Sequence, residues 1–127
     1  MGFGQAISAG FSKYINFRDR ASRSEYWFWI LFYTIGAIAT GVIDLALGVQ
    51  VTSGVFGLVM IIPNISVAVR RLHDRDYSGW WYLLVFIPLI GWLILFIWFC
   101  LKGTDGPNRF GPDPLADLAI PGTARAA

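Results

Sequence analysis

Charged side chains are scarce in this sequence, and their scarcity excludes several classes of protein. Charged residues make up 14% of the 127 residues and hydrophobic residues 56%, whereas soluble domains average about 25% and about 45–50%. The ten Lys and Arg exceed the eight Asp and Glu by only two charges, which is too small an excess for a nucleic-acid-binding protein. We therefore expect no nucleic-acid partner.

Cysteine and histidine are scarcer still. The single cysteine, Cys100, and the single histidine, His73, exclude an intrachain disulfide and the paired ligand spacing of a zinc site. The chain also has no Gly-x-Ser-x-Gly motif and no phosphate-binding loop. We expect neither a metal nor a cofactor, and we expect that the protein is not an enzyme.

Three long apolar runs predict an all-α polytopic membrane protein with three transmembrane helices, at about 27–48, 51–69 and 80–101. At ~1.5 Å per residue these runs are about 33, 28 and 33 Å long, enough for a hydrocarbon core of about 30 Å. Pro88 and Gly91 interrupt the third run. We favour one kinked span there over a re-entrant hairpin, because each half would be too short to cross.

The segments outside these runs have their own patterns. Apolar residues at helical spacing predict a short amphipathic helix at about 3–16, lying in the membrane interface or packed on the spans. Ser22 with Glu25 three residues later predicts a capping box that begins the first span. Closely spaced Gly, Pro, Asp and Asn residues after Lys102 predict a turn-rich tail. We expect residues 1–115 to form one domain and residues 116–127 to be a disordered tail.

The stretch 70–82, RRLHDRDYSGWWY, is the most polar part of the chain between two apolar runs, and we call it the hinge. The N-terminal segment 13–25 likewise combines arginines with carboxylates just before a Tyr-Trp pair. By the positive-inside rule, both segments are cytoplasmic, and a third span then places the C-terminal tail outside. Arginines and carboxylates of the two segments are expected to form forked ion pairs.

Several residues are candidates for contacts with lipid headgroups or between helices. They are Arg18, Arg20, Arg23, Glu25, Trp27, Arg70, Arg71, His73, Asp74, Trp80 and Trp81. Adjacent residues on a helix diverge by about 100°, so the His73 and Asp74 side chains do not face each other. We therefore favour a His73 that caps the second span and bonds a backbone carbonyl or an aspartate, over a catalytic or metal-binding one.

Asp44 and Asn64 are the candidate polar residues inside the membrane. Asp44 lies about 26 Å along the first span, near the far interface, so we interpret it as a wetted boundary residue. Asn64 follows Pro63, and its amide is expected to face another helix. The alternative is that Asn64 lines a polar pathway.

Four motifs taken together make the chain similar to a known family. FRDRASRSEYWFW, RRLHDRDYSGWW, IPLIGW and GTDGPNRFGPDP occur in this order, and their order and spacing resemble the family catalogued as domain of unknown function 805. The resemblance covers about residues 10–114. One departure is Asp19, where the family usually has Gly. The resemblance implies a multi-pass protein of the bacterial cytoplasmic (inner) membrane and implies no established activity.

The function that we expect is that of a non-enzymatic membrane module. Three spans enclose little volume, and small residues on the first span allow close approach of another helix, so the chain is expected to associate with itself or with a membrane complex. Membrane lipids are its other expected partners. The alternative is a small transporter or channel component for an ion or small solute, which would use Asp44 and Asn64.

Overall fold

Five helices make up the regular structure of residues 2–115, the part of the chain that this computed structural model describes. In chain order they are α1 (Phe3–Ser12), α2 (Arg23–Leu47), α3 (Thr52–Asp74), the 3-10 helix η1 (Gly79–Phe86) and α4 (Ile90–Cys100). The all-α class is confirmed over this range. The tail expected to be disordered, 116–127, lies outside the described residues.

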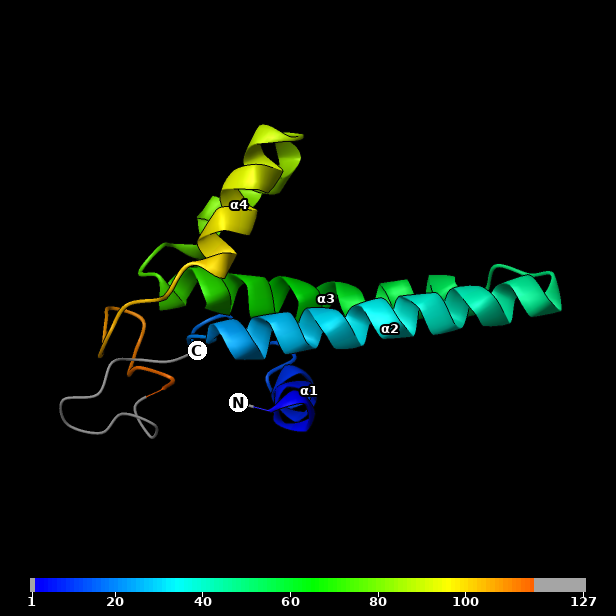
Figure 1. The fold of residues 1–127 in the computed structure, drawn as a ribbon, viewed down its shortest axis with the longest axis horizontal. Helices are drawn as coiled ribbons and strands as arrows, with labels where there is room; N and C mark the ends of the chain where they lie inside the picture. The colour runs from blue at the N-terminus through cyan, green and yellow to red at the C-terminus, as the bar shows by residue number, and fades with distance from the viewer. Residues whose placement is uncertain (1, 116–127) are drawn as a thin grey trace.

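The helices α2 and α3 form a long antiparallel pair (Figure 1). Both are long and apolar enough to cross a membrane. Ser22 begins α2 by accepting a hydrogen bond from the Glu25 backbone N–H at 3.3 Å. At the far end Asp44 accepts the N–H groups of Thr52 and Ser53, each at 2.9 Å. Asp44 therefore closes the turn between the two helices and caps the start of α3.

The pair packs closely where a small residue faces a ring. A Cβ atom at Gly36 would lie 2.4 Å from the Phe56 ring, so the absence of a side chain at Gly36 is what allows α3 to approach α2. Tyr33 stacks on the same ring at 5.7 Å between centroids. Nearer the polar end, the Trp29 side chain is fully buried, as is that of Val67, so the core of the chain lies between α2 and α3.

The third apolar run is not the single span that we predicted. Residues 79–100 form two short helices, η1 and α4, joined by a reversal at Ile87–Leu89. The Ile90 N–H bonds to the Pro88 carbonyl at 2.8 Å across Leu89, whose φ is 65° and ψ −67°; these are the values of a strained γ-turn. The sequence therefore reverses direction where we expected a kink.

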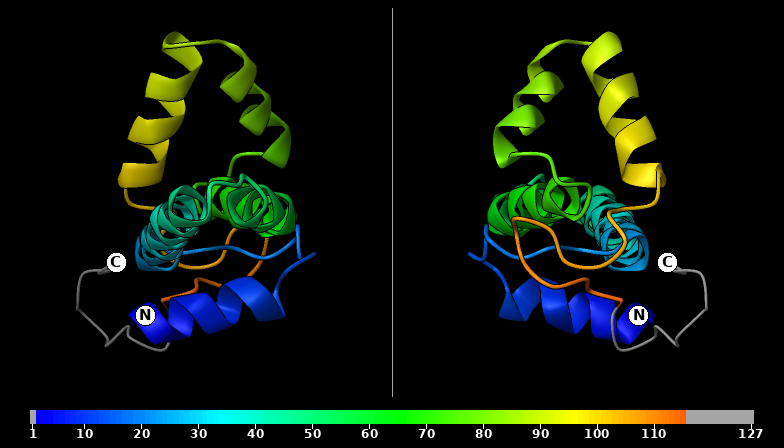
Figure 2. Two further views of the ribbon diagram at one scale, coloured as in Figure 1. Left: turned by 90° about the vertical axis from the view of Figure 1, so that its right-hand side faces the viewer. Right: turned by 90° about the vertical axis from the view of Figure 1, so that its left-hand side faces the viewer.

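A glycine makes this reversal possible. A Cβ atom at Gly91 would lie 1.9 Å from the Leu84 carbonyl oxygen, so α4 can start beside η1 only because residue 91 has no side chain. The resulting hairpin extends away from the α2–α3 pair, on the side opposite to α1 (Figure 2).

Because the hairpin returns, the tail comes back to the end of the pair from which the hairpin started (Figure 1). The Thr104 N–H bonds to the Asp74 carbonyl at 2.6 Å, and the Ala21 N–H bonds to the Arg70 carbonyl at 2.9 Å. The N-terminal segment, the end of α3 and the tail as far as Leu115 therefore lie together. This arrangement differs from the expected one, in which the third span placed the tail on the opposite side of the membrane from the hinge.

The first helix, α1, is shorter than the predicted 3–16 and packs on the side of the pair. Phe11 makes edge-to-face contacts with Trp29 at 5.2 Å and with Phe32 at 5.8 Å. A Cβ atom at Gly10 would lie 2.2 Å from the Trp29 ring. Of the two predicted placements, packing on the chain's own helices is the one that the structure contains.

Candidate functional site

Five charged side chains are buried together at the polar end of the α2–α3 pair, and we call them the ion cluster. They are Arg20, Glu25, Arg70, Arg71 and Asp74. None of them is more than 4% exposed, and buried charges persist in proteins only when they are paired and hydrogen-bonded. The cluster joins three stretches that are distant in sequence: the N-terminal segment with the start of α2, the end of α3, and the tail.

Asp74 is the centre of the cluster. Its carboxylate accepts from the Arg20 guanidinium, with an N–O distance of 3.0 Å, and from that of Arg71 at 2.7 Å. Gly103 lies directly against this carboxylate, because a Cβ atom there would be 2.0 Å from Asp74 Oδ2. One aspartate at the end of α3 therefore links two arginines and determines how closely the tail approaches.

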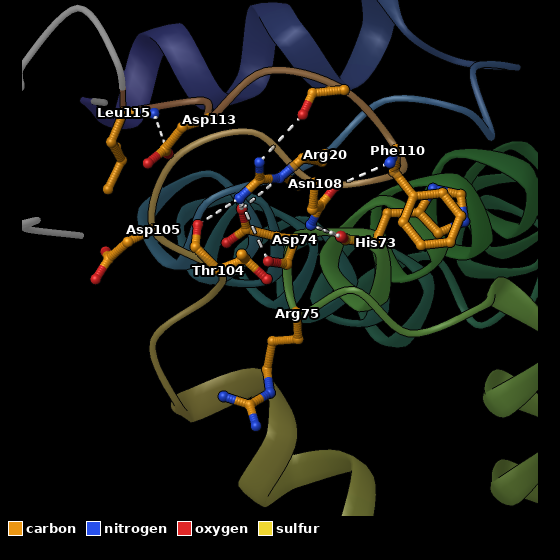
Figure 3. A network of polar contacts seen from close by, with 12 residues as sticks. Arg20, His73, Asp74, Arg75, Thr104, Asp105, Asn108, Phe110, Asp113 and Leu115 are labelled. Carbon is orange, nitrogen blue, oxygen red and sulfur yellow. Dashed lines mark hydrogen bonds and ion pairs between the residues drawn. The ribbon is translucent and has the colours of Figure 1, made fainter.

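The two arginines on Asp74 extend in different directions. Arg20 donates to the backbone carbonyls of Thr104 at 2.6 Å and Gly106 at 2.7 Å, which lie in the tail (Figure 3). Arg71 donates to the carbonyls of Phe99 at 3.2 Å and Leu101, at the end of α4. The Phe99 and Leu101 carbonyls have no further helical turn to bond to, so the Arg71 guanidinium satisfies groups that the end of α4 leaves free.

Arg70 and Glu25 form a second ion pair across the α2–α3 interface. Both side chains are almost fully buried, with 0% and 2% of their surface exposed. The Glu25 carboxylate therefore contacts another helix. In the predicted capping box it would instead bond to the backbone at the start of its own helix. Within residues 2–115, Arg70 Nε and Nη2 have no hydrogen-bond partner, so Arg70 uses its guanidinium far less completely than Arg71 does.

His73 faces the N-terminal segment. Its Nδ1 lies 3.1 Å from the carbonyl oxygens of both Arg18 and Asp19, and its ring stacks on Phe110 at 3.8 Å between centroids. The Asn108 amide also donates to the His73 carbonyl at 2.9 Å. The His73 residue is 6% exposed, and an imidazole with its usual pKa of about 6.5 is mostly neutral at pH 7.

This geometry joins elements and forms no His-Asp dyad. The His73 imidazole is held by the N-terminal segment, whereas the Asp74 carboxylate is held by Arg20 and Arg71. In the described part of the chain, no three His, Cys, Asp or Glu side chains are grouped so as to hold a metal ion. The arrangement is suited to fixing the positions of helices relative to one another.

The other predicted site residues lie around the cluster. Arg18 is exposed, Arg23 donates to the Cys100 carbonyl at 3.3 Å, and Trp27 Nε1 donates to the Phe99 carbonyl at 3.2 Å. Trp80 and Trp81 in η1 are 78% and 49% exposed. The structure therefore brings Arg23 and Trp27 to the end of α4 and leaves the two hinge tryptophans at the surface.

The two polar residues predicted inside the membrane have partners within the chain. Asn64 Oδ1 accepts from Trp29 Nε1 at 2.8 Å, which links α3 to α2. Asp44 binds the backbone of the far turn, as described above, and the Ser53 hydroxyl also donates to it. Both side chains therefore make structural links.

The tail contributes residues that sequence reasoning missed. Gly103, Asn108 and Phe110 contact Asp74 and His73, but their pattern indicated only turns. The signal available was the density of Gly and Asn in that stretch, and it does not show what the turns pack against. The backbone carbonyls that receive Arg20 have no sequence signal at all.

Comparison with known proteins places the chain in a family. The family model described as "Protein of unknown function (DUF805)" matches residues 14–112. The chain belongs to the DUF805 family. That match spans both Arg-rich segments, the hairpin and most of the tail, so it contains the whole ion cluster. No solved structure matches the chain.

The relatives of the chain include three proteins of Escherichia coli K12. "Inner membrane protein YhaH" is 47% identical over 107 residues, covering 80% of this chain and 88% of that protein. "Inner membrane protein YhaI" is 46% identical over 103 residues, covering 80% and 87%. "Uncharacterized protein YiiR" is 30% identical over 81 residues, covering 63% and 53%. The first two names support the bacterial inner membrane as the location of this DUF805 chain.

The one departure from the family pattern, Asp19, lies in a turn that does not need glycine. The Asn16 side chain accepts the N–H groups of Arg18 at 2.9 Å and Asp19 at 3.1 Å. Among the non-glycine residues of the described chain, positive φ occurs only at Asp76 and Leu89. A side chain at position 19 is therefore compatible with this turn.

Proposed function

We propose that this chain is a non-enzymatic membrane module that crosses the inner membrane twice, through α2 and α3, and assembles with a second copy through the η1–α4 hairpin. The observation that carries the proposal is the surface of this hairpin. It has no charged residue between Gly79 and Cys100, and its exposed apolar side chains occur along both helices and at the turn.

The orientation follows from the distribution of charge. Every Lys and Arg among the described residues lies at the end of the pair that carries the ion cluster, in the N-terminal segment, the end of α3 with the hinge, or the tail. The turn at 48–51 has none. By the positive-inside rule, the cluster end is cytoplasmic, and the tail to Leu115 is cytoplasmic with it.

The hairpin is too short to cross. The 11 residues of α4 span about 16 Å at ~1.5 Å per residue, roughly half of a hydrocarbon core. A helix that lies in the interface plane needs a polar face, and α4 has none. The hairpin therefore has to be surrounded by hydrocarbon or by protein.

The turn at the tip favours protein as its cover. Ile87, Pro88 and Leu89 are exposed, and their backbone is not helical. Non-helical backbone at membrane depth is tolerated where protein or a water-filled cavity covers it, and not where it meets lipid. A second copy can supply such a cover, because α2 and α3 also carry exposed apolar residues, among them Ile38 and Leu58.

Site-specific photocrosslinking in membranes at native expression tests this assembly. A photoreactive residue at Leu89, which is 75% exposed, is expected to give a discrete adduct at twice the mass of the chain, whereas one at Leu47, 68% exposed at the far turn, is the matched control. No protein adduct at Leu89 would contradict assembly through the hairpin. An adduct with a different protein would contradict self-association and would identify a membrane complex instead.

A further inference from the structure

A pocket of about 440 Å³ lies between α3 and η1, outside the contacts described so far. Its lining residues are Phe17, Ile65, Val69, His73, Ser78, Gly79, Trp80, Tyr82 and Leu83. Ile65, Val69 and His73 follow one another at successive turns of α3, so the wall changes from apolar to polar as α3 approaches the ion cluster. The pocket is therefore amphipathic, with an apolar body and a polar end.

The polar end has an unused hydrogen-bond acceptor. Nδ1 of His73 faces two backbone carbonyls, which can only accept, so Nδ1 carries the proton and Nε2 of the neutral ring is an acceptor. Nε2 lies on the pocket side, 3.6 Å from where a Gly79 Cβ atom would be. The hydrogen bonds of the His73 ring within residues 2–115 are made by Nδ1, and Nε2 is not among the fully enclosed unpartnered atoms, so a group in the pocket can reach it.

We propose that this pocket binds one phospholipid whose headgroup donates a hydrogen bond to His73 Nε2. The inference rests on the proposed membrane placement of α2 and α3, which puts the pocket at the cytoplasmic boundary of the hydrocarbon. Leu83 and Trp80 carry the apolar lining out to the surface, where they are 54% and 78% exposed, so acyl chains can continue from the pocket into the bilayer.

One basic residue is close to the pocket in sequence. Arg18 follows the lining residue Phe17 and is exposed, and it lines a neighbouring hollow together with Asp19. An exposed arginine at the membrane boundary attracts anionic lipid headgroups. A wholly apolar occupant would leave the Nε2 acceptor without a partner.

The proposal distinguishes lipids by whether their headgroups carry a donor. Phosphatidylethanolamine has ammonium N–H groups and phosphatidylglycerol has hydroxyl groups, whereas phosphatidylcholine has neither. Phosphatidylethanolamine and phosphatidylcholine have the same phosphate and the same net charge and differ in the N–H groups of the ammonium, so the difference between these two isolates the hydrogen bond. Phosphatidylglycerol, which also has a net negative charge, tests a hydroxyl donor. We expect a preference of about five- to tenfold for the two donor lipids, the factor that one hydrogen bond supplies.

Native mass spectrometry of the full chain in detergent measures this preference, with equal amounts of each lipid added in turn. One phosphatidylethanolamine or one phosphatidylglycerol per chain, retained about five- to tenfold better than phosphatidylcholine, is the expected result, and the two arms show which donor fits. Equal retention of all three lipids would overturn the proposal. The measurement counts lipids per chain, so its outcome is independent of whether the hairpin mediates self-association.

Two substitutions at His73 separate the acceptor from the structural role of the ring. In His73→Asn the amide occupies the place of Nδ1 and can still donate to the N-terminal segment, but nothing replaces Nε2. We expect retention of the donor lipids to fall to the level of phosphatidylcholine, and His73→Gln, whose amide reaches the Nε2 position, to restore the preference. If His73→Asn lowered the retention of all three lipids equally, His73 would be only a structural residue and the proposal would fail.

A second pair of variants tests the apolar body of the pocket. Leu83→Trp fills the pocket and is expected to abolish retention of every lipid, whereas Leu47→Trp places the same bulk on an exposed site at the far turn and leaves retention unchanged. Equal effects of the two substitutions, or none, would show that the bound lipid lies elsewhere.

Discussion

Replacing Gly91 by alanine tests whether residues 79–101 turn back, because a hairpin and a kinked span predict opposite changes in the stability of the protein. In the hairpin, a Cβ atom at position 91 would lie 1.9 Å from the Leu84 carbonyl oxygen and 3.0 Å from Ile87 Cβ. An ordinary contact between carbon and oxygen is about 3.3 Å, so the carbonyl must retreat by more than about 1 Å. Both neighbours belong to the hairpin's own backbone or are fixed to it, so no side chain can rotate away.

The two models differ in magnitude as well as in sign. Overpacking of this kind costs about 1–3 kcal/mol, and we expect Gly91→Ala to reach the upper end because the obstacle is backbone. In a continuous helix the same substitution would stabilise by about 1 kcal/mol. The difference between the two models is therefore about 4 kcal/mol, which a single unfolding experiment resolves.

Thermal unfolding in detergent, followed by circular dichroism, is a suitable assay. Gly57→Ala is the matched control, because Gly57 lies inside α3 and a Cβ atom there would meet nothing within 4 Å. We expect Gly57→Ala to raise the melting temperature and Gly91→Ala to lower it by several degrees. A Gly91→Ala variant that became more stable in parallel with Gly57→Ala would refute the hairpin.

Three further substitutions test the ion cluster and the turn by the same melting assay. Asp74→Asn is expected to destabilise the protein by about 3–5 kcal/mol, because it leaves two buried guanidinium groups without their carboxylate. Asp76→Asn, which breaks an exposed ion pair, should cost less than about 1 kcal/mol. Equal losses of stability would show that the Asp74 carboxylate is not buried between the two arginines. Arg71→Lys is expected to lower stability more than Arg70→Lys does. The Arg71 guanidinium donates to one carboxylate and several carbonyls, whereas the Arg70 guanidinium bonds only Glu25. The reverse order would show that the contacts of the two arginines are assigned wrongly. Leu89→Gly is expected to stabilise by about 1 kcal/mol, because glycine adopts positive φ without strain, and a loss of stability would show that Leu89 does not adopt this conformation.

The two long helices could be predicted from the sequence, because their signals are local. Length, hydropathy and the Ser22 cap located α2 to within a few residues. The second span was predicted to end at residue 69, and α3 continues beyond that residue to Asp74. Hydropathy ended that span at the first arginine, but Arg70 and Arg71 are buried and paired, so the helix can continue through them.

The hairpin could not be predicted by the same reasoning. Pro88 and Gly91 indicated an interruption, and a kink and a reversal share that signal. What decides between them is the close approach of Gly91 to the Leu84 carbonyl and the positive φ of Leu89. The first is a contact between two helices, and leucine rarely adopts the second, so neither appears in composition or periodicity.

The candidate site was predictable in its components but not in its connections. Clustered arginines and carboxylates indicated ion pairs between the N-terminal segment and the hinge, and the structure contains Arg20–Asp74 and Arg70–Glu25. The role of the tail was missed because the predicted third span placed it across the membrane from its partners. Because residues 80–101 were predicted to be a single span, the contact of Gly103 with the ion cluster could not be predicted.

Single-cysteine labelling in intact cells shows whether the tail lies on the same side of the membrane as the N-terminal segment. With Cys100→Ala as background, Arg18→Cys, Gln50→Cys and Asp105→Cys introduce cysteines in the N-terminal segment, the far turn and the tail, all at exposed sites. A membrane-impermeant maleimide is predicted to label Gln50→Cys in intact cells, and the other two only after permeabilisation. Labelling of Asp105→Cys in intact cells, with Arg18→Cys still protected, would show that the tail and the N-terminal segment lie on opposite sides of the membrane.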